Sequence, residues 1–136
     1  GADGATQARM HRFGLDLGYA FQIADDVLDY TADAATMGKN LGDDLAEGKA
    51  TLPLIHAMAH AGKDRRERLR AIIENGEVEA LPEVLDAIEA AGSIAYSRNQ
   101  AQHYAEAAER ALDGLPDNDW IGALRGLARY AVSRNH

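Results

Sequence analysis

Apolar residues recur at helical spacing along most of the chain, and no segment alternates between apolar and polar positions as a strand would. The first long segment, residues 5–30, is predicted to form one long helix with a single apolar stripe: Phe13, Leu17, Phe21, Ala24 and Leu28. The last predicted helix carries a similar stripe: Ile121, Leu124, Leu127, Ala128 and Val132. The pattern therefore predicts an all-α protein.

Helix ends in the middle of the chain are marked by capping residues. Thr51 and the nearby Pro53 predict a helix over residues 52–61. Asp64 is the predicted cap of the next helix, and Gly76 is its predicted end. These signals divide the middle of the chain into short helices.

The second half of the chain continues in the same way. Pro82 opens a fourth predicted helix, Gly92 ends it, and the helical pattern restarts over residues 93–112. Asn118 or Asp119 is then predicted to cap the last helix. The chain contains no internal repeat and no low-complexity tract.

Only residues 31–50 lack a clear helical stripe, and they are rich in Gly, Thr, Asp and Asn. They are predicted to form a long loop. A loop of this length in a compact domain is usually a binding loop or a disordered segment. We expect a bound ligand to order it.

The charge balance narrows the classes of partner. Lys and Arg number 14 against 22 Asp and Glu, and the net charge of −8 disfavours a nucleic-acid partner. Residues 25–49 hold seven of the acids and only two of the bases. Such a concentration of acid is either a solvated surface or a cation site, and the spacing of the acids decides between them.

Length and composition set further limits. A chain of 136 residues is long enough for one domain. It contains no Cys, which fits a reducing compartment, and a cytoplasmic location is the default expectation. No apolar run approaches the roughly 18 residues that a transmembrane helix needs.

Acidic residues form a stripe on the first predicted helix. Gln22, Asp25 and Asp29 lie close to one line, and Asp26 flanks it. An unneutralised pair of like charges one turn apart costs a helix roughly 0.2–0.5 kcal/mol, and a hard cation such as Mg²⁺ would offset this cost. The acidic motif alone fits a solvated helix face equally well.

Two lysines change that balance. Lys39 and Lys49 flank the second acidic group, which contains Asp43, Asp44 and Glu47. Lysine is a flexible point charge that suits phosphate oxygens. Carboxylates alternating with lysines suit a diphosphate that a metal ion bridges.

Two motifs in order carry a family resemblance. The first runs from Phe21-Gln22 through Asp25-Asp26 and Asp29 to Tyr30, and the second runs from Gly38-Lys39-Asn40 through Gly42-Asp43-Asp44 and Glu47-Gly48-Lys49 to Thr51-Leu52-Pro53. Together they resemble the polyprenyl diphosphate synthases, which are trans-prenyltransferases. The chain is most similar to the long-chain, octaprenyl-type branch, which makes quinone side chains.

This resemblance implies an antiparallel helix bundle, namely the C-terminal part of the isoprenoid synthase fold. Residues 1–136 would form the C-terminal portion of one synthase domain, and the half with the first aspartate-rich motif would lie outside this chain. The whole enzyme would extend an allylic diphosphate with isopentenyl diphosphate, would use Mg²⁺ and would form a homodimer. The portion alone is expected to be inactive.

The resemblance also implies roles for individual residues. Asp25 resembles the family's Mg²⁺ ligand, with Asp26, Asp29 and Asp44 supporting the metal. The other matching positions hold the substrate or lie near the reacting carbon: Phe21, Gln22, Lys39, Lys49 and, as a thin match to a basic C-terminus, Arg134. Asp25, Gln22 and Lys39 would take part in catalysis.

Other interpretations stay open. The chain could be a non-catalytic helical subunit that keeps the half-site as a relic, or part of a terpene cyclase, although the two lysines favour chain elongation. His56 and His60 lie one turn apart and could hold a metal, but a partly exposed helix face is the favoured interpretation. Trp120 is predicted to anchor the core.

Overall fold

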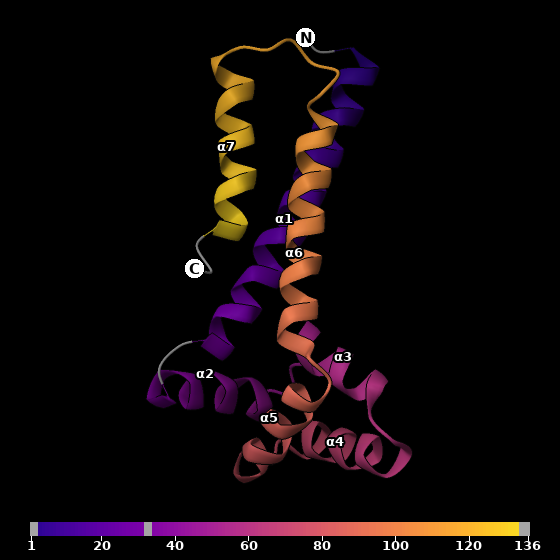
Figure 1. The fold of residues 1–136 in the computed structure, drawn as a ribbon, viewed down its shortest axis with the longest axis vertical. Helices are drawn as coiled ribbons and strands as arrows, with labels where there is room; N and C mark the ends of the chain where they lie inside the picture. The colour runs from indigo at the N-terminus through magenta and orange to yellow at the C-terminus, as the bar shows by residue number, and fades with distance from the viewer. Residues whose placement is uncertain (1–2, 32–33, 134–136) are drawn as a thin grey trace. The chain divides into compact units, whose positions relative to one another are not determined.

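The computed structural model describes residues 3–31 and 34–133, and every regular element within them is a helix (Figure 1). The predicted all-α class is confirmed. The elements are α1 (Gly4–Thr31), α2 (Ala34–Ala46), α3 (Leu52–His60), α4 (Lys63–Asn75), the 3-10 helix η1 (Val78–Ala80), α5 (Leu81–Ala90), α6 (Ser93–Ala111) and α7 (Asp119–Ser133).

The helices form two compact units. Unit 1 comprises residues 1–24 and 98–136, and unit 2 comprises residues 25–97. The division crosses α1 and α6, so each of these helices contributes to both units. In unit 1, α6 runs antiparallel to α1 and to α7 (Figure 1).

Unit 2 has a core of large aliphatic side chains. Helices α2, α3, α4 and α5 pack around it, and η1 contacts α2 and α5. Each fully buried Leu, Ile or Val contributes roughly 1.5–3 kcal/mol relative to an exposed one. The largest of its buried residues are Leu45, Leu54, Leu69, Ile72, Val84 and Ile88.

Unit 1 buries smaller side chains. Phe13, Leu112 and Ile121 are its large core residues. Alanines fill most of the remaining buried positions and let the helices approach closely: Ala20, Ala105, Ala108, Ala128 and Ala131. Trp120, which the sequence predicted as a core anchor, is instead 69% exposed. Its neighbour Ile121 points into the core, and successive residues of a helix point in different directions.

Several predicted helix ends are confirmed. Thr51 is the extended N-cap residue of α3, and Pro53 lies in the first turn of that helix. Gly76 ends α4 in the left-handed conformation, with φ of 61°. Asn118 caps α7 through its side-chain oxygen, which accepts a hydrogen bond of 2.9 Å from the backbone N–H of Ile121.

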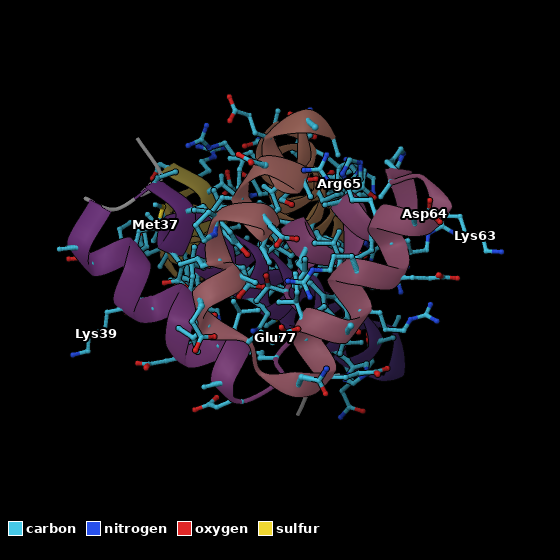
Figure 2. The ribbon with its side chains drawn as sticks, turned by 90° about the horizontal axis from the view of Figure 1, so that it is seen from below. Met37, Lys39, Lys63, Asp64, Arg65 and Glu77 are labelled. Carbon is cyan, nitrogen blue, oxygen red and sulfur yellow. The ribbon has the colours of Figure 1, made fainter. Side chains whose placement is uncertain are left out.

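The predicted cap of α4 is wrong. Gly62 holds the N-cap position, and Asp64 lies inside the first turn (Figure 2 labels it on α4). A carboxylate there is still favourable, because it faces the positive end of the helix dipole.

The prediction of a loop over residues 31–50 is also wrong, because most of this segment forms the helix α2. Leu41 and Leu45, one turn apart, are buried and hold α2 against the rest of unit 2. Gly38 and Gly42 argued against a helix in the sequence, since each glycine costs a helix about 1 kcal/mol relative to Ala. At Gly42 a Cβ atom would lie only 3.3 Å from Cγ1 of Val78, so the glycine permits close packing of η1.

In the part of the chain that the structure describes, no helix is both long and apolar enough to cross a membrane.

Candidate functional site

The C-terminal end of α1 carries the acidic motif into unit 2. Asp25 is exposed, whereas Asp26 is only 7% exposed. The pKa of Asp26 is raised to about 6, first by burial and then by the negative charges of Asp29, Asp44 and Asp25, against the opposing effect of Lys49. These charges therefore act on one another in the folded chain, as the sequence spacing predicted.

Asp29 is tied to α2. Its Oδ1 atom accepts a hydrogen bond of 3.3 Å from Nδ2 of Asn40. Burial raises the pKa of Asp29, and the neighbouring charge of Asp44 raises it as well, while the Asn40 hydrogen bond lowers it. The fold of residues 34–46 as a helix is what brings Asn40 to this carboxylate.

The turn after α2 positions Lys49. Gly48 has φ of 70°, the left-handed conformation that glycine adopts without strain. The N–H of Gly48 bonds to the carbonyl of Leu45 at 3.0 Å, and the N–H of Lys49 bonds to the carbonyl of Asp44 at 2.9 Å. This is the Schellman pattern, and it turns Lys49 back over the end of the helix. Its Nζ atom lies 4.0 Å from Oδ1 of Asp44.

Tyr30 links α1 to the start of α3. Its hydroxyl lies 3.2 Å from Oγ1 of Thr51, and burial raises its pKa to about 12. The Tyr30 ring also lines a largely apolar cavity of about 380 Å³ together with Met37, Ile88 and Ile94. Tyr30 thus connects the acidic end of α1 to the interior of unit 2.

Three other predicted residues lie on α1 and α2. Lys39 is exposed and extends from α2 away from the neighbouring helices (Figure 2). Phe21 and Gln22 precede the acidic motif on α1 but belong to unit 1, where the Phe21 ring packs against Tyr130 with centroids 6.5 Å apart. Arg134 lies outside the described residues.

The donor set suits a hard divalent cation. Carboxylate oxygens are the ligands that Mg²⁺ prefers, and a cation would relieve the carboxylate repulsion that adds to the effect of burial on the pKa of Asp26. Within residues 3–31 and 34–133, no three His, Asp or Glu side chains are grouped closely enough to hold a metal ion alone. A cation at the acidic end of α1 would therefore need water or phosphate oxygens to complete its shell.

Two contacts of this site were missed by sequence reasoning. Asn40 belongs to the second motif, but its hydrogen bond to Asp29 depends on the helix α2, which the sequence did not predict. The contact between Tyr30 and Thr51 joins residues 21 positions apart. An apolar spacing of four, from Met37 to Leu41 and Leu45, was the available signal for the helix.

Known proteins match the chain over nearly its whole length. The octaprenyl diphosphate synthase of Escherichia coli (strain K12) is 49% identical over 124 residues, which is 90% of this chain and 38% of that protein. The crystal structure of a polyprenyl synthase from Caulobacter crescentus CB15, complexed with calcium and isoprenyl diphosphate, has a TM-score of 0.80 at 41% identity and covers 99% of this chain and 42% of that one.

A polyprenyl synthase structure from Roseobacter denitrificans has a TM-score of 0.86 at 34% identity, over 98% of this chain and 43% of that one. The predicted fold, that of the isoprenoid synthases, is therefore confirmed. The chain spans about two fifths of the length of the relatives it matches. The sequence profile of the polyprenyl synthetases matches residues 1–90, and the chain belongs to this family of prenyltransferases.

Proposed function

We propose that this chain is the C-terminal part of a magnesium-dependent trans-prenyltransferase and that it holds the allylic diphosphate. The observation that carries the proposal is the mixed charge around the buried Asp26, where Asp29 and Asp44 act together with Lys49. Carboxylates for a metal ion and an ammonium group for phosphate oxygens are what a metal-bridged diphosphate requires.

Each residue of the group has a distinct task in this proposal. Asp25 is the direct metal ligand, and Asp26, Asp29 and Asp44 support the metal through bound water. Lys49 is positioned by the turn at Gly48, and its ammonium group binds the diphosphate oxygens. Magnesium, when bound, stabilises the negative charge that develops as the allylic carbon–oxygen bond breaks.

The exposed residues complete the substrate site. Lys39 is free to swing toward the diphosphate, because its side chain is solvent-exposed on α2. Phe21 and Gln22 lie near the reacting carbon in this proposal, and Arg134 adds a positive charge. Asp25, Gln22 and Lys39 are the proposed catalytic residues.

The full reaction extends the allylic diphosphate with isopentenyl diphosphate. The 49% identical octaprenyl diphosphate synthase favours a long-chain product of the kind attached to quinones. The calcium and isoprenyl diphosphate of the Caulobacter crescentus structure favour a divalent cation and a prenyl diphosphate substrate here. We further propose that the whole enzyme is a homodimer.

The chain alone is proposed to be inactive. It spans about two fifths of its relatives, and in this proposal the groups that bind isopentenyl diphosphate and the first aspartate-rich motif belong to the remainder. Elongation of farnesyl diphosphate by the purified chain with Mg²⁺ would contradict this part of the proposal.

Calorimetry with farnesyl diphosphate tests the binding role. We expect binding that requires Mg²⁺ and that Lys49→Ala weakens. Lys63→Ala removes another exposed lysine, on α4 in the same unit, and serves as the matched control. Equal affinities for the two variants would refute the assignment of Lys49.

Turnover of an enzyme that contains this segment tests the metal ranking. Asp25→Ala should lower turnover far more than Asp29→Ala, because a direct ligand matters more than one that acts through water. Equal losses would show that the ranking is wrong.

A further inference from the structure

Thr51 holds the N-cap position of α3 but does not cap this helix with its side chain. Its backbone carbonyl starts the helix by accepting a hydrogen bond of 2.9 Å from the N–H of Ile55, whereas its hydroxyl makes no hydrogen bond to the first turn. A threonine at this position ordinarily satisfies one of the free N–H groups at the start of the helix. The hydroxyl of Thr51 is therefore engaged elsewhere.

This hydroxyl is directed to α1 instead. Its Oγ1 atom lies 3.2 Å from the hydroxyl oxygen of Tyr30, and Thr51 is only 5% exposed. Because burial limits the access of water, removal of either hydroxyl deprives the other of a hydrogen-bond partner that water replaces poorly. A local cap has thus been given up for a contact between residues 21 positions apart.

The contact closes the short segment that carries Lys49. Residues 49–51 belong to no helix, and Lys49 within them is exposed. One end of the segment is fixed by the turn after α2, where the N–H of Lys49 bonds to the carbonyl of Asp44 at 2.9 Å. The other end is Thr51, and its bond to Tyr30 fastens that end to the part of α1 that carries the aspartates.

We propose that Tyr30 and Thr51 are positioning residues for the diphosphate, because their hydrogen bond holds the segment of Lys49 beside the aspartates of α1. This inference rests on the proposed function, in which Lys49 binds the diphosphate oxygens. Lysine has a long and flexible side chain, so the location of its ammonium group depends on how firmly its backbone is held. Neither hydroxyl touches the substrate, and the pair acts through Lys49.

Each hydroxyl can be removed with little change in the shape of the side chain. Tyr30→Phe keeps the ring that packs against the core of unit 2, and Thr51→Val keeps a β-branched side chain of similar size. Thr51→Ser keeps the hydroxyl and is the conservative variant. Tyr96→Phe removes the hydroxyl of an exposed tyrosine in the same unit and is the matched control.

Amide hydrogen exchange of the purified chain, without metal or diphosphate, tests the structural step. We expect Tyr30→Phe and Thr51→Val to accelerate exchange of the Lys49 N–H about three- to tenfold, the factor that one hydrogen bond is worth. The double variant should exchange no faster than either single variant, since all three lack the same bond. Thr51→Ser and Tyr96→Phe should keep the original rate.

Calorimetry with farnesyl diphosphate and Mg²⁺ tests the functional step. We expect Tyr30→Phe and Thr51→Val each to weaken binding about three- to tenfold, and Thr51→Ser to bind as the unsubstituted chain does. In a Lys49→Ala background the same substitutions should have no further effect, because they act through Lys49. A merely structural role would weaken binding by the same factor in both backgrounds.

The two measurements separate this inference from the proposed function. Unchanged exchange of the Lys49 N–H in both Tyr30→Phe and Thr51→Val would overturn the positioning role, even if the chain binds the diphosphate. Equal weakening of binding with and without Lys49 would overturn it as well. Accelerated exchange in a chain that binds no farnesyl diphosphate would refute the proposed function, and with it the role of the pair toward the diphosphate.

Discussion

The two units of the chain bury different kinds of side chain. Unit 2 fills its core with leucine, isoleucine and valine, whereas unit 1 relies on alanines between long helices. Of the eight large apolar residues that are exposed in the described part of the chain, five belong to unit 1: Leu15, Tyr19, Trp120, Leu127 and Tyr130. Unit 1 therefore leaves much of its apolar surface facing outward.

The difference in core packing between the units parallels the distribution of their charged residues. The acidic cluster and Lys49 lie on unit 2, where repulsion among carboxylates works against folding and a well-packed aliphatic core offsets it. The described residues of unit 1 include no such cluster, and their exposed apolar side chains are of the kind that packs against further protein. The proposed substrate site on unit 2 requires a rigid core beneath it, whereas the exposed apolar residues of unit 1 can be buried by a partner.

The core of unit 2 should give the largest effect. Ile72 is fully buried, so Ile72→Ala should cost about 2–5 kcal/mol of unfolding free energy through lost burial and a cavity. Amide exchange within residues 25–97 should accelerate. Ile55→Ala removes the same side chain from a position that is 49% exposed in the same unit and should cost less than about 0.5 kcal/mol. Similar costs for the two variants would show that the core is assigned wrongly.

The acidic cluster should destabilise unit 2 at neutral pH. Because the pKa of Asp26 is raised from 3.8 to about 6, its contribution to stability is greatest below about pH 4 and is lost as the pH rises through about 6. Asp26→Asn cannot ionise and should stabilise the chain by about 1–3 kcal/mol at about pH 7, but hardly at about pH 4.

Urea unfolding without Mg²⁺ at several pH values measures this difference. Asp43→Asn, an exposed neighbour on α2, is the control and should leave the pH profile unchanged. A stabilisation by Asp26→Asn that is the same at both pH values would contradict the account of Asp26 as a buried, repelled carboxylate.

The sequence predicted helices well where their ends carry local signals. Gly76 and Asn118 act through hydrogen bonds within one turn, so their effect is visible in neighbouring residues. The prediction from sequence failed at α2 and at Trp120, where packing against distant residues determines the structure. Gly42 opposes a helix locally but permits the contact with Val78, and no local rule records that contact.

The site was predictable to a similar extent. The carboxylates of Asp25, Asp26 and Asp29 follow from helical spacing, and Lys49 follows from the second motif. The tie between Asp29 and Asn40 depends on the relative placement of α1 and α2 within unit 2, which the sequence pattern does not determine. Lys39 was grouped with Lys49 in the sequence, yet the fold leaves it extended into solvent.

Two glycines of the α2 region test this correction with opposite signs. Gly48→Ala forces an L residue into the left-handed region and should cost about 1–2 kcal/mol, and it should also shift Lys49 from Asp44. Gly38→Ala adds a methyl group inside α2 with no atom within 4 Å and should stabilise by about 0.5–1 kcal/mol. Thermal unfolding of both variants decides, and stabilisation by Gly48→Ala or destabilisation by Gly38→Ala would favour the loop over the helix.

Trp120 tests the outward face of unit 1 with the smallest expected effect. It is the single tryptophan of the chain, so its fluorescence reports on this position alone. At 69% exposure, we expect emission close to that of free tryptophan in water and ready quenching by acrylamide. Trp120→Ser should change the free energy of unfolding by less than about 0.5 kcal/mol.

The adjacent Ile121 is the matched control, because it is buried in the core of unit 1 and Ile121→Ala should cost about 2–5 kcal/mol. A large loss from Trp120→Ser would place Trp120 in a core, as the sequence pattern suggested. Blue-shifted emission that turns red on dilution would show that a second copy covers this face. In that case the exposed apolar residues of unit 1 are buried by self-association, and the contrast with unit 2 holds only for the isolated chain.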